Sequence, residues 1–129
     1  MTQIQAGISA PVPSLARYLF LAAIPGADLH GALRELPELV DGEHSVVGLG
    51  RSLVHALGCE VKGLKIFPSH AEARVEVAST PVDLWCWLRG DDRGELMHRA
   101  RRIEKALSGA FRLQQTIDAF QYESGRDLT

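Results

Sequence analysis

The chain has 129 residues, a length suited to one domain. Its 14 lysine and arginine residues against 16 aspartate and glutamate residues give a net charge of −2, so the charge provides no electrostatic basis for binding DNA or RNA. Apolar residues make up 46% and charged residues 23%, as in an ordinary globular chain, and no apolar run approaches the ~18 residues that a membrane span requires. Cys59 and Cys86 form no CxxC pair, and residues 1–15 lack the pattern of an export signal, so we expect a cytoplasmic domain.

The first third of the chain predicts an arm, a strand and a helix. Residues 1–16 combine glycine and proline with apolar residues that show no period, which is typical of an extended arm. Residues 18–24 form a short apolar run that ends at a Pro-Gly turn, which predicts a buried strand. Asp28 is placed to cap a helix that Pro37 either ends or kinks. The apolar stripe of this helix consists of Leu29, Leu33 and Leu36.

The middle of the chain predicts a second strand, a short helix and a loop. Residues 45–49 are predominantly apolar and predict the strand. Ser52 is placed to cap the short helix, and Gly58 supplies the left-handed residue that ends it. Residues 59–80 carry a weak signal, and we interpret them as a loop with a short extended piece at residues 64–67.

The last third predicts a strand, a long helix and a final strand. Residues 84–88 are apolar at every position and predict the third strand. Asp91 or Asp92 caps a charged helix, and residues 111–117 alternate roughly, as in a strand exposed on one side. The apolar residues of the helix recur on one face at Leu96, Ala100, Ile103 and Leu107.

This order of elements predicts an α+β fold of the ferredoxin-like type, β-α-β-β-α-β, with a four-stranded antiparallel sheet and helices on one face. We expect the domain to span residues 17–122, after the arm at residues 1–16 and before a polar tail at residues 123–129.

The predicted sheet has one face without a partner. The strands at residues 18–24 and 84–88 do not alternate, so both faces of the sheet require cover. One interpretation is that the loop at residues 59–80 folds over the open face. We favour the other, in which a second sheet packs there, supplied by a following domain or by a second copy of the chain.

Two short motifs favour structure over chemistry. Residues 48–50 (Gly-Leu-Gly) follow a strand and precede a helix, but Leu53 stands where a dinucleotide loop has its third glycine, which favours a tight turn. Trp85 and Trp87 are two residues apart and point to the same face of their strand, where core or interface packing is the favoured role.

Charged and metal-binding residues assemble no active site in the sequence. None of the histidines is paired at the spacing that brings two imidazoles to one metal from a helix, and we predict no metal site and no catalytic residue. These histidines are His30, His44, His55, His70 and His98. The cations of the long helix are interspersed with glutamates and predict a solvated face. They are Arg99, Arg101, Arg102 and Lys105.

Several stretches in order resemble the N-terminal half of a dye-decolourising (DyP-type) haem peroxidase of the compact bacterial branch. They are Gln5–Ile8, Val46–Gly50, Ile66–Pro68, Thr80–Arg89, Asp118–Tyr122 and Gly125–Thr129. The last is the most specific, because in the family an Arg-Asp-Leu-x tail continues directly into a GxxDG segment.

The resemblance implies two ferredoxin-like domains with facing sheets, with haem b bound chiefly by the second domain. It also implies that the distal Asp, the distal Arg and the proximal His of the family lie beyond residue 129, so this chain alone is expected to lack the catalytic residues and to bind no haem. Only Arg126 and Asp127 are expected near a haem edge. From the open sheet face we further expect a homo-oligomer, and from charge and hydropathy we expect no nucleic-acid or membrane partner.

Two other functions remain open. One is a non-catalytic ferredoxin-like module that associates with itself through its open sheet. The other is a dimeric α/β-barrel oxygenase or ligand-binding protein whose site forms between two copies.

Overall fold

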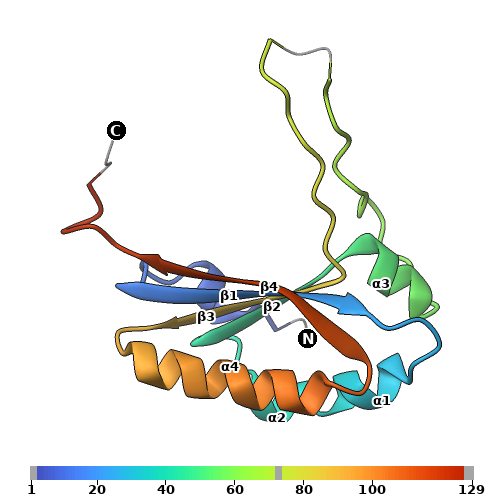
Figure 1. Cartoon of the computed structure of the whole chain (residues 1–129), viewed down its shortest axis with the longest axis horizontal. Coiled ribbons are helices and arrows are strands. Elements are labelled where there is room, and N and C mark those ends of the chain that lie inside the picture. The colour runs from blue at the N-terminus through green and yellow to red at the C-terminus, as the bar shows by residue number, and fades with distance from the viewer. Residues whose placement is uncertain (1–2, 72–73, 127–129) are drawn as a thin grey trace.

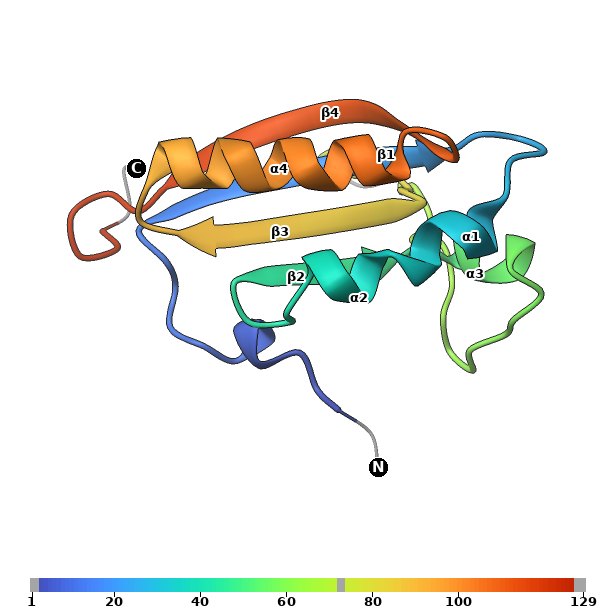
Figure 2. The same ribbon diagram turned by 90° about the horizontal axis from the view of Figure 1, so that it is seen from below.

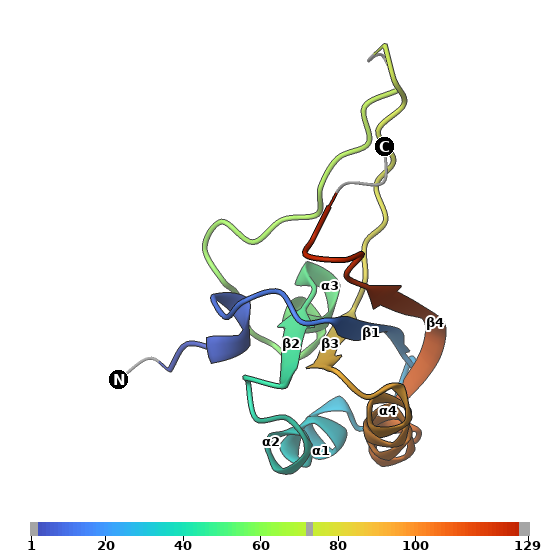
Figure 3. The same cartoon turned by 90° about the vertical axis from the view of Figure 1, so that its left-hand side faces the viewer.

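The computed structural model describes residues 3–71 and 74–126 and contains one antiparallel sheet with helices packed on one face (Figures 1 and 3). Its four strands are β1 (Leu15–Ala23), β2 (Ser45–Leu49), β3 (Leu84–Gly90) and β4 (Phe111–Phe120). Their order in the sheet is β2-β3-β1-β4, with every neighbouring pair antiparallel. This is the order of the predicted ferredoxin-like plan, which is therefore confirmed.

The helices are α1 (Leu29–Arg34), α2 (Leu36–Leu39), α3 (Arg51–Ala56) and α4 (Arg93–Leu107). Of these, α1, α2 and α4 form the second layer of the domain, and α3 lies at the end of the sheet at the base of the following loop (Figures 1 and 3). Helix α4 lies along the sheet, with α1 and α2 beside it (Figure 2). Within the described residues, none of the helices has both the length and the hydropathy needed to cross a bilayer.

Aspartate side chains begin two of the helices, as predicted. Asp28 Oδ1 accepts the N–H of Gly31 at 2.9 Å, and Asp92 Oδ1 accepts the N–H of Glu95 at 2.8 Å. The predicted cap at Ser52 is wrong, because α3 begins at Arg51 and its N-cap is Gly50. A Cβ at Gly50 would collide with the carbonyl oxygen of Val82, so the tight strand-to-helix turn requires a glycine.

The core lies between α4 and the adjoining face of the sheet. Leu19 and Leu21 of β1 are almost fully buried against it, and the predicted apolar stripe of α4 is buried along its whole length. Cys86 of β3 is also fully buried, and this burial raises the pKa of its thiol to about 12. The α4 stripe and the strands thus supply the main hydrophobic stabilisation of the domain.

The arm before β1 is folded onto the sheet edge, which corrects the prediction of an extended arm. Its residues Ala6–Ile8 form a 3₁₀ turn, η1, and β1 begins at Leu15. The side-chain amide of Gln5 donates to the carbonyl of Val47 at 2.7 Å and accepts the N–H of Val47 at 2.8 Å. Gln5 therefore pairs with the free edge of β2 as a strand residue would.

Residues 59–80 form a loop that stands away from the sheet, which we call the projecting loop. It rises on the side of the sheet opposite α1, α2 and α4 and does not lie along the open face (Figures 1 and 3). Nearly all of its described residues are exposed. The interpretation in which this loop covers the open face is therefore wrong, and the predicted extended piece at residues 64–67 forms no strand.

Candidate functional site

The open face of the sheet carries a cluster of aromatic side chains. Tyr18 of β1 stacks on Trp85 and Trp87 of β3, with ring centroids 5.7 and 6.2 Å apart. The strand register places Phe20 next to Trp85 on the same face. All four rings are half-buried. We call Tyr18, Phe20, Trp85 and Trp87 the aromatic face. Because both tryptophan rings stack on Tyr18, the prediction that they point to the same face of the strand is confirmed.

The end of the aromatic face opens into a groove between the N-terminal arm and the C-terminal tail. The groove has a volume of about 380 Å³, within the range of small-molecule sites. Its walls are mainly apolar and aromatic, with one cation. The side chains that define it are Val12, Tyr18, Trp87, Phe120, Tyr122 and Arg126.

The end of β4 is fixed beside this groove by an ion pair. Arg17 of β1 donates two hydrogen bonds to the carboxylate of Asp118, at 2.8 and 3.0 Å. The bond from Arg17 is the main cause of the lowered pKa of Asp118. Arg93, at the start of α4, lies 3.4 Å from the same carboxylate. This bidentate pair holds β4 against β1 where the chain leaves the sheet for the tail.

Arg126 lies in the groove, and Asp127 falls outside the described residues. The Arg126 side chain is largely exposed and its guanidinium lies 3.3 Å from a carboxylate oxygen of Glu123. The turn that carries it contains Gly125 at a φ of 92°. Arg126 thus remains accessible to a ligand, because an exposed ion pair of this kind costs little to break.

Arg89 is a buried cation beside Trp87, on the same side of β3, and the sequence assigned no role to it. Its guanidinium lies 4.8 Å from the ring centroid of Trp87, and it donates to the carbonyls of Glu43 and Pro11. A single arginine at the end of an apolar strand is a weak signal in sequence. In the structure, Arg89 ties the N-terminal arm to the sheet and supports Trp87 from one side.

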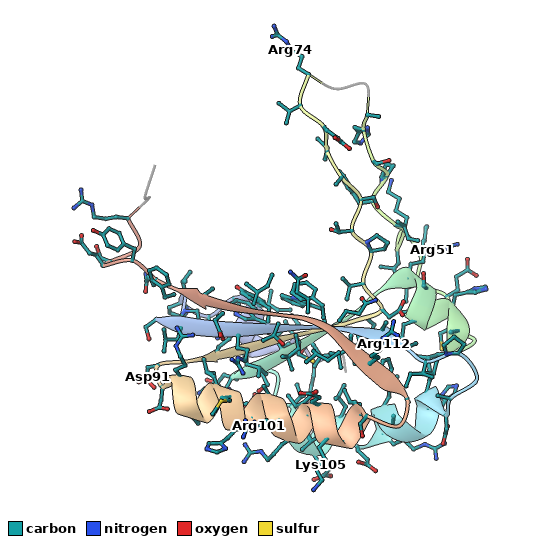
Figure 4. All side chains as sticks on the ribbon, in the orientation of Figure 1. Arg51, Arg74, Asp91, Arg101, Lys105 and Arg112 are labelled. Carbon is teal, nitrogen blue, oxygen red and sulfur yellow. The ribbon has the colours of Figure 1, made fainter. Side chains whose placement is uncertain are left out.

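The prediction of a wholly solvated cationic face on α4 is wrong for Arg99. Arg101 and Lys105 extend away from the sheet into solvent (Figure 4). Arg99 is 9% exposed and donates to the carbonyls of His44 and Arg89 at 2.8 and 3.1 Å. Its position one turn from the buried Ile103 places it at the border of the apolar stripe, where a long side chain reaches strand-end carbonyls.

The histidines lie apart in the fold. His98 is exposed on α4, as predicted, and His44 Nδ1 lies 3.0 Å from Asp41 Oδ2 in an exposed turn. Among the residues that the structure describes, no group of three His, Cys, Asp or Glu side chains has the geometry to hold a metal ion.

The described lining of the groove offers no histidine, cysteine or methionine to a haem iron. Haem iron in proteins is held by His, Cys, Met or Tyr. The groove lining contains no His, Cys or Met among the described residues, and its Tyr18 is stacked against Trp85 and Trp87. It does offer aromatic cover for a porphyrin and, in Arg126, a cation suited to a carboxylate such as a propionate.

Comparison with known proteins identifies the fold. No family model matches the sequence, and no curated protein matches it either. A candidate DyP-type peroxidase from Shewanella oneidensis superposes with a TM-score of 0.86 at 22% identity, over 99% of this chain and 46% of that one. The encapsulated DyP-type peroxidase of Mycobacterium smegmatis gives 0.82 at 23% identity, over 94% and 43%.

DyPB from Rhodococcus jostii gives a TM-score of 0.79 at 19% identity, over 98% of this chain and 46% of that one, and variants of that protein have been solved in complex with haem. The chain therefore spans less than half the length of the structures that it matches. The predicted resemblance is confirmed at the level of architecture: this chain has the ferredoxin-like fold of one half of a DyP-type peroxidase.

Proposed function

We propose that this chain is the N-terminal domain of a haem-dependent DyP-type peroxidase, an enzyme that oxidises dyes, porphyrins or phenols with hydrogen peroxide. The observation that carries the proposal is the superposition of 99% of the chain on 46% of the Shewanella oneidensis structure at a TM-score of 0.86. The aromatic face supports it, since half-buried rings on an otherwise open sheet are suited to burial against a second sheet.

In this proposal the chain contributes a wall of the haem cavity and not the chemistry at the iron. Bound haem supplies the iron at which peroxide is reduced. The aromatic rings of Tyr18 and Trp87 exclude water from one side of the cavity, and Arg126 pairs with a propionate. Asp127, the next residue along the chain, belongs near the haem edge in the same proposal. The acid–base groups that handle peroxide and the axial ligand come from the second domain.

The test begins with hemin titrated into the purified 129-residue chain and into the chain joined to the domain encoded after Thr129. We expect a stoichiometric Soret band and peroxide-dependent dye oxidation from the joined protein only. A stoichiometric, active complex of the 129-residue chain alone would refute the division of roles. A joined protein that binds no haem would refute the assignment as a peroxidase.

A matched pair of variants tests the role of Arg126 within the joined protein. Arg126→Ala removes the cation of the groove and is expected to weaken hemin binding about tenfold, the loss typical of one charge-assisted contact. Arg101→Ala removes an arginine from the solvent side of α4 and is the control. Equal hemin affinity in the two variants would contradict the position of Arg126 at the haem edge.

A second candidate function is favoured by the exposure of the aromatic face in the single chain. Two copies could bury their open faces against each other and form a non-catalytic dimer. Sedimentation of the 129-residue chain over a range of concentrations tests this, and Ile117→Lys places a charge on the open face of β4 as the disrupting variant. A dimer that the variant abolishes, with no haem binding by the joined protein, would favour this function over the peroxidase.

A further inference from the structure

The two limbs of the projecting loop are paired with each other by backbone hydrogen bonds. His70 and Val77 form an isolated bridge in which the N–H of His70 donates to the carbonyl of Val77 at 2.9 Å, and the reverse bond measures 3.4 Å. Nearer the sheet, residues 64–67 of one limb and 78–82 of the other line a common cavity of about 310 Å³. The two limbs therefore support each other above the base of the loop.

Exposed apolar side chains are concentrated on this loop. Phe67 is 56% exposed and packs edge-on against the ring of His70, with 5.6 Å between the ring centroids. The exposed large apolar residues of the loop are Val61, Ile66, Phe67, Val75 and Val77. Single exposed apolar residues are normal on a protein surface, but several on one thin loop leave a large apolar area in water. This pattern is typical of a surface that another chain segment covers.

The loop and the tail stand on the same side of the sheet, at opposite ends of the open face. Figures 1 and 3 show that both rise from the side of the sheet opposite α1, α2 and α4. The tail side also carries exposed apolar residues, namely Phe120 and Tyr122. A layer seated on the aromatic face would therefore lie between the projecting loop and the tail.

We infer that the projecting loop is a side wall that grips the second ferredoxin-like domain, with Ile66 and Phe67 as its apolar anchors. This inference rests on the proposed function, because the occupant is the domain that follows the tail in that proposal. Two observations select this occupant: the described part of the tail rises on the side of the aromatic face, and the Shewanella oneidensis structure, of which this chain covers 46%, is more than twice as long as this chain. The polar residues around the anchors, Lys62, Lys65 and Glu76, form the solvated rim of the contact.

The test measures the affinity of the 129-residue chain for the following domain, produced as a separate polypeptide, by titration calorimetry. Three variants are compared with the wild-type chain. The double substitution Ile66→Ser/Phe67→Ser removes the loop anchors, Ile117→Lys disrupts the open face, and Ile8→Ser removes an exposed isoleucine of η1 as the control. All of these side chains are exposed, so the variants are expected to fold, and circular dichroism confirms that they do.

We expect the loop variant to raise the dissociation constant about tenfold or more, the size of a lost anchor residue, and the control to stay within about twofold. If the wild-type chain binds and only Ile117→Lys weakens binding, the loop is no wall and this inference fails alone. If the wild-type chain does not bind a following domain that circular dichroism shows to be folded, the proposed function fails and this inference fails with it. If the loop variant instead abolishes a dimer of the 129-residue chain, the occupant is a second copy, and the assignment to the second domain is wrong.

Discussion

Gln5 gives the most direct test of how the N-terminal arm contributes to the fold. Its amide makes two hydrogen bonds, at 2.7 and 2.8 Å, to the carbonyl and N–H of Val47 on the free edge of β2. Gln5→Ala removes both partners from a part-buried pair of backbone groups. Since a typical hydrogen bond contributes ~0.5–1.5 kcal/mol, the expected loss of unfolding free energy is about 1–3 kcal/mol.

Urea unfolding followed by the fluorescence of Trp85 and Trp87 measures this loss. With a slope of ~1–3 kcal/mol per M urea, a loss of about 2 kcal/mol lowers the midpoint by roughly 1 M. Gln3→Ala shortens the same kind of side chain two residues earlier in the arm, where no hydrogen bond of the side chain is found among the described residues, and serves as the control. Equal midpoints for the two variants would show that the arm adds nothing to stability.

A second substitution at Gln5, to glutamate, tests the pairing with Val47 through the pH dependence of stability. Gln5→Glu keeps an acceptor for the N–H of Val47 but places an oxygen against its carbonyl. Only the protonated carboxyl can donate there, so folding raises the pKa of the new group above its unfolded value of ~4.3. The variant is therefore destabilised above its folded pKa and regains stability, relative to wild type, as the pH falls below that value. A difference from wild type that does not change between pH 7 and pH 4 would refute the pairing.

Three further predictions follow from single contacts. Asp92→Ala removes the cap of α4 and is expected to lower the unfolding free energy by about 0.5–2 kcal/mol. Asp91→Ala, at the neighbouring exposed aspartate, is the control and is expected to change the unfolding free energy by less than ~0.5 kcal/mol, with both measured by urea unfolding. Partial burial acts to raise the pKa of Asp41, but its bonds from the N–H groups of residues 43–45 and from a histidine ring outweigh this and lower that pKa. The stability that Asp41 contributes is therefore present above its unfolded pKa of ~3.9 and lost as the pH falls toward the folded value, so the acid slope of the unfolding free energy should flatten in Asp41→Asn. Finally, the exposed Cys59 should react with a thiol reagent at pH 8 while the buried Cys86, whose pKa is raised to about 12, reacts only in denaturant, and two reactive thiols in the native chain would contradict this.

Helix periodicity and strand composition predicted most of the fold. The stripe of α4 fixed which side of that helix is buried, and the uninterrupted apolar runs of β1 and β3 indicated a sheet that requires cover on both faces. These features are local, since they depend on spacings of a few residues along one element. They are therefore readable before the strands are placed next to one another.

Features that depend on a distant partner could not be predicted in the same way. Arg99 has the composition of a solvated helix position, yet it is buried because the ends of β2 and β3 present carbonyls beside it. Gln5 carries no signal of its role, because the free edge of β2 exists only once the sheet is assembled. The projecting loop likewise has little periodicity, and only the fold shows which side of the sheet it occupies.

The candidate site follows the same division. The sequence by itself determined that Trp85 and Trp87 share one face, because alternation along a strand is a local property. Only the tertiary structure brought Tyr18 against them and joined Trp87, Phe120 and Arg126 into one groove, since these residues come from three separate segments. A surface made of distant segments is decided by chain packing, which the order of residues does not state directly.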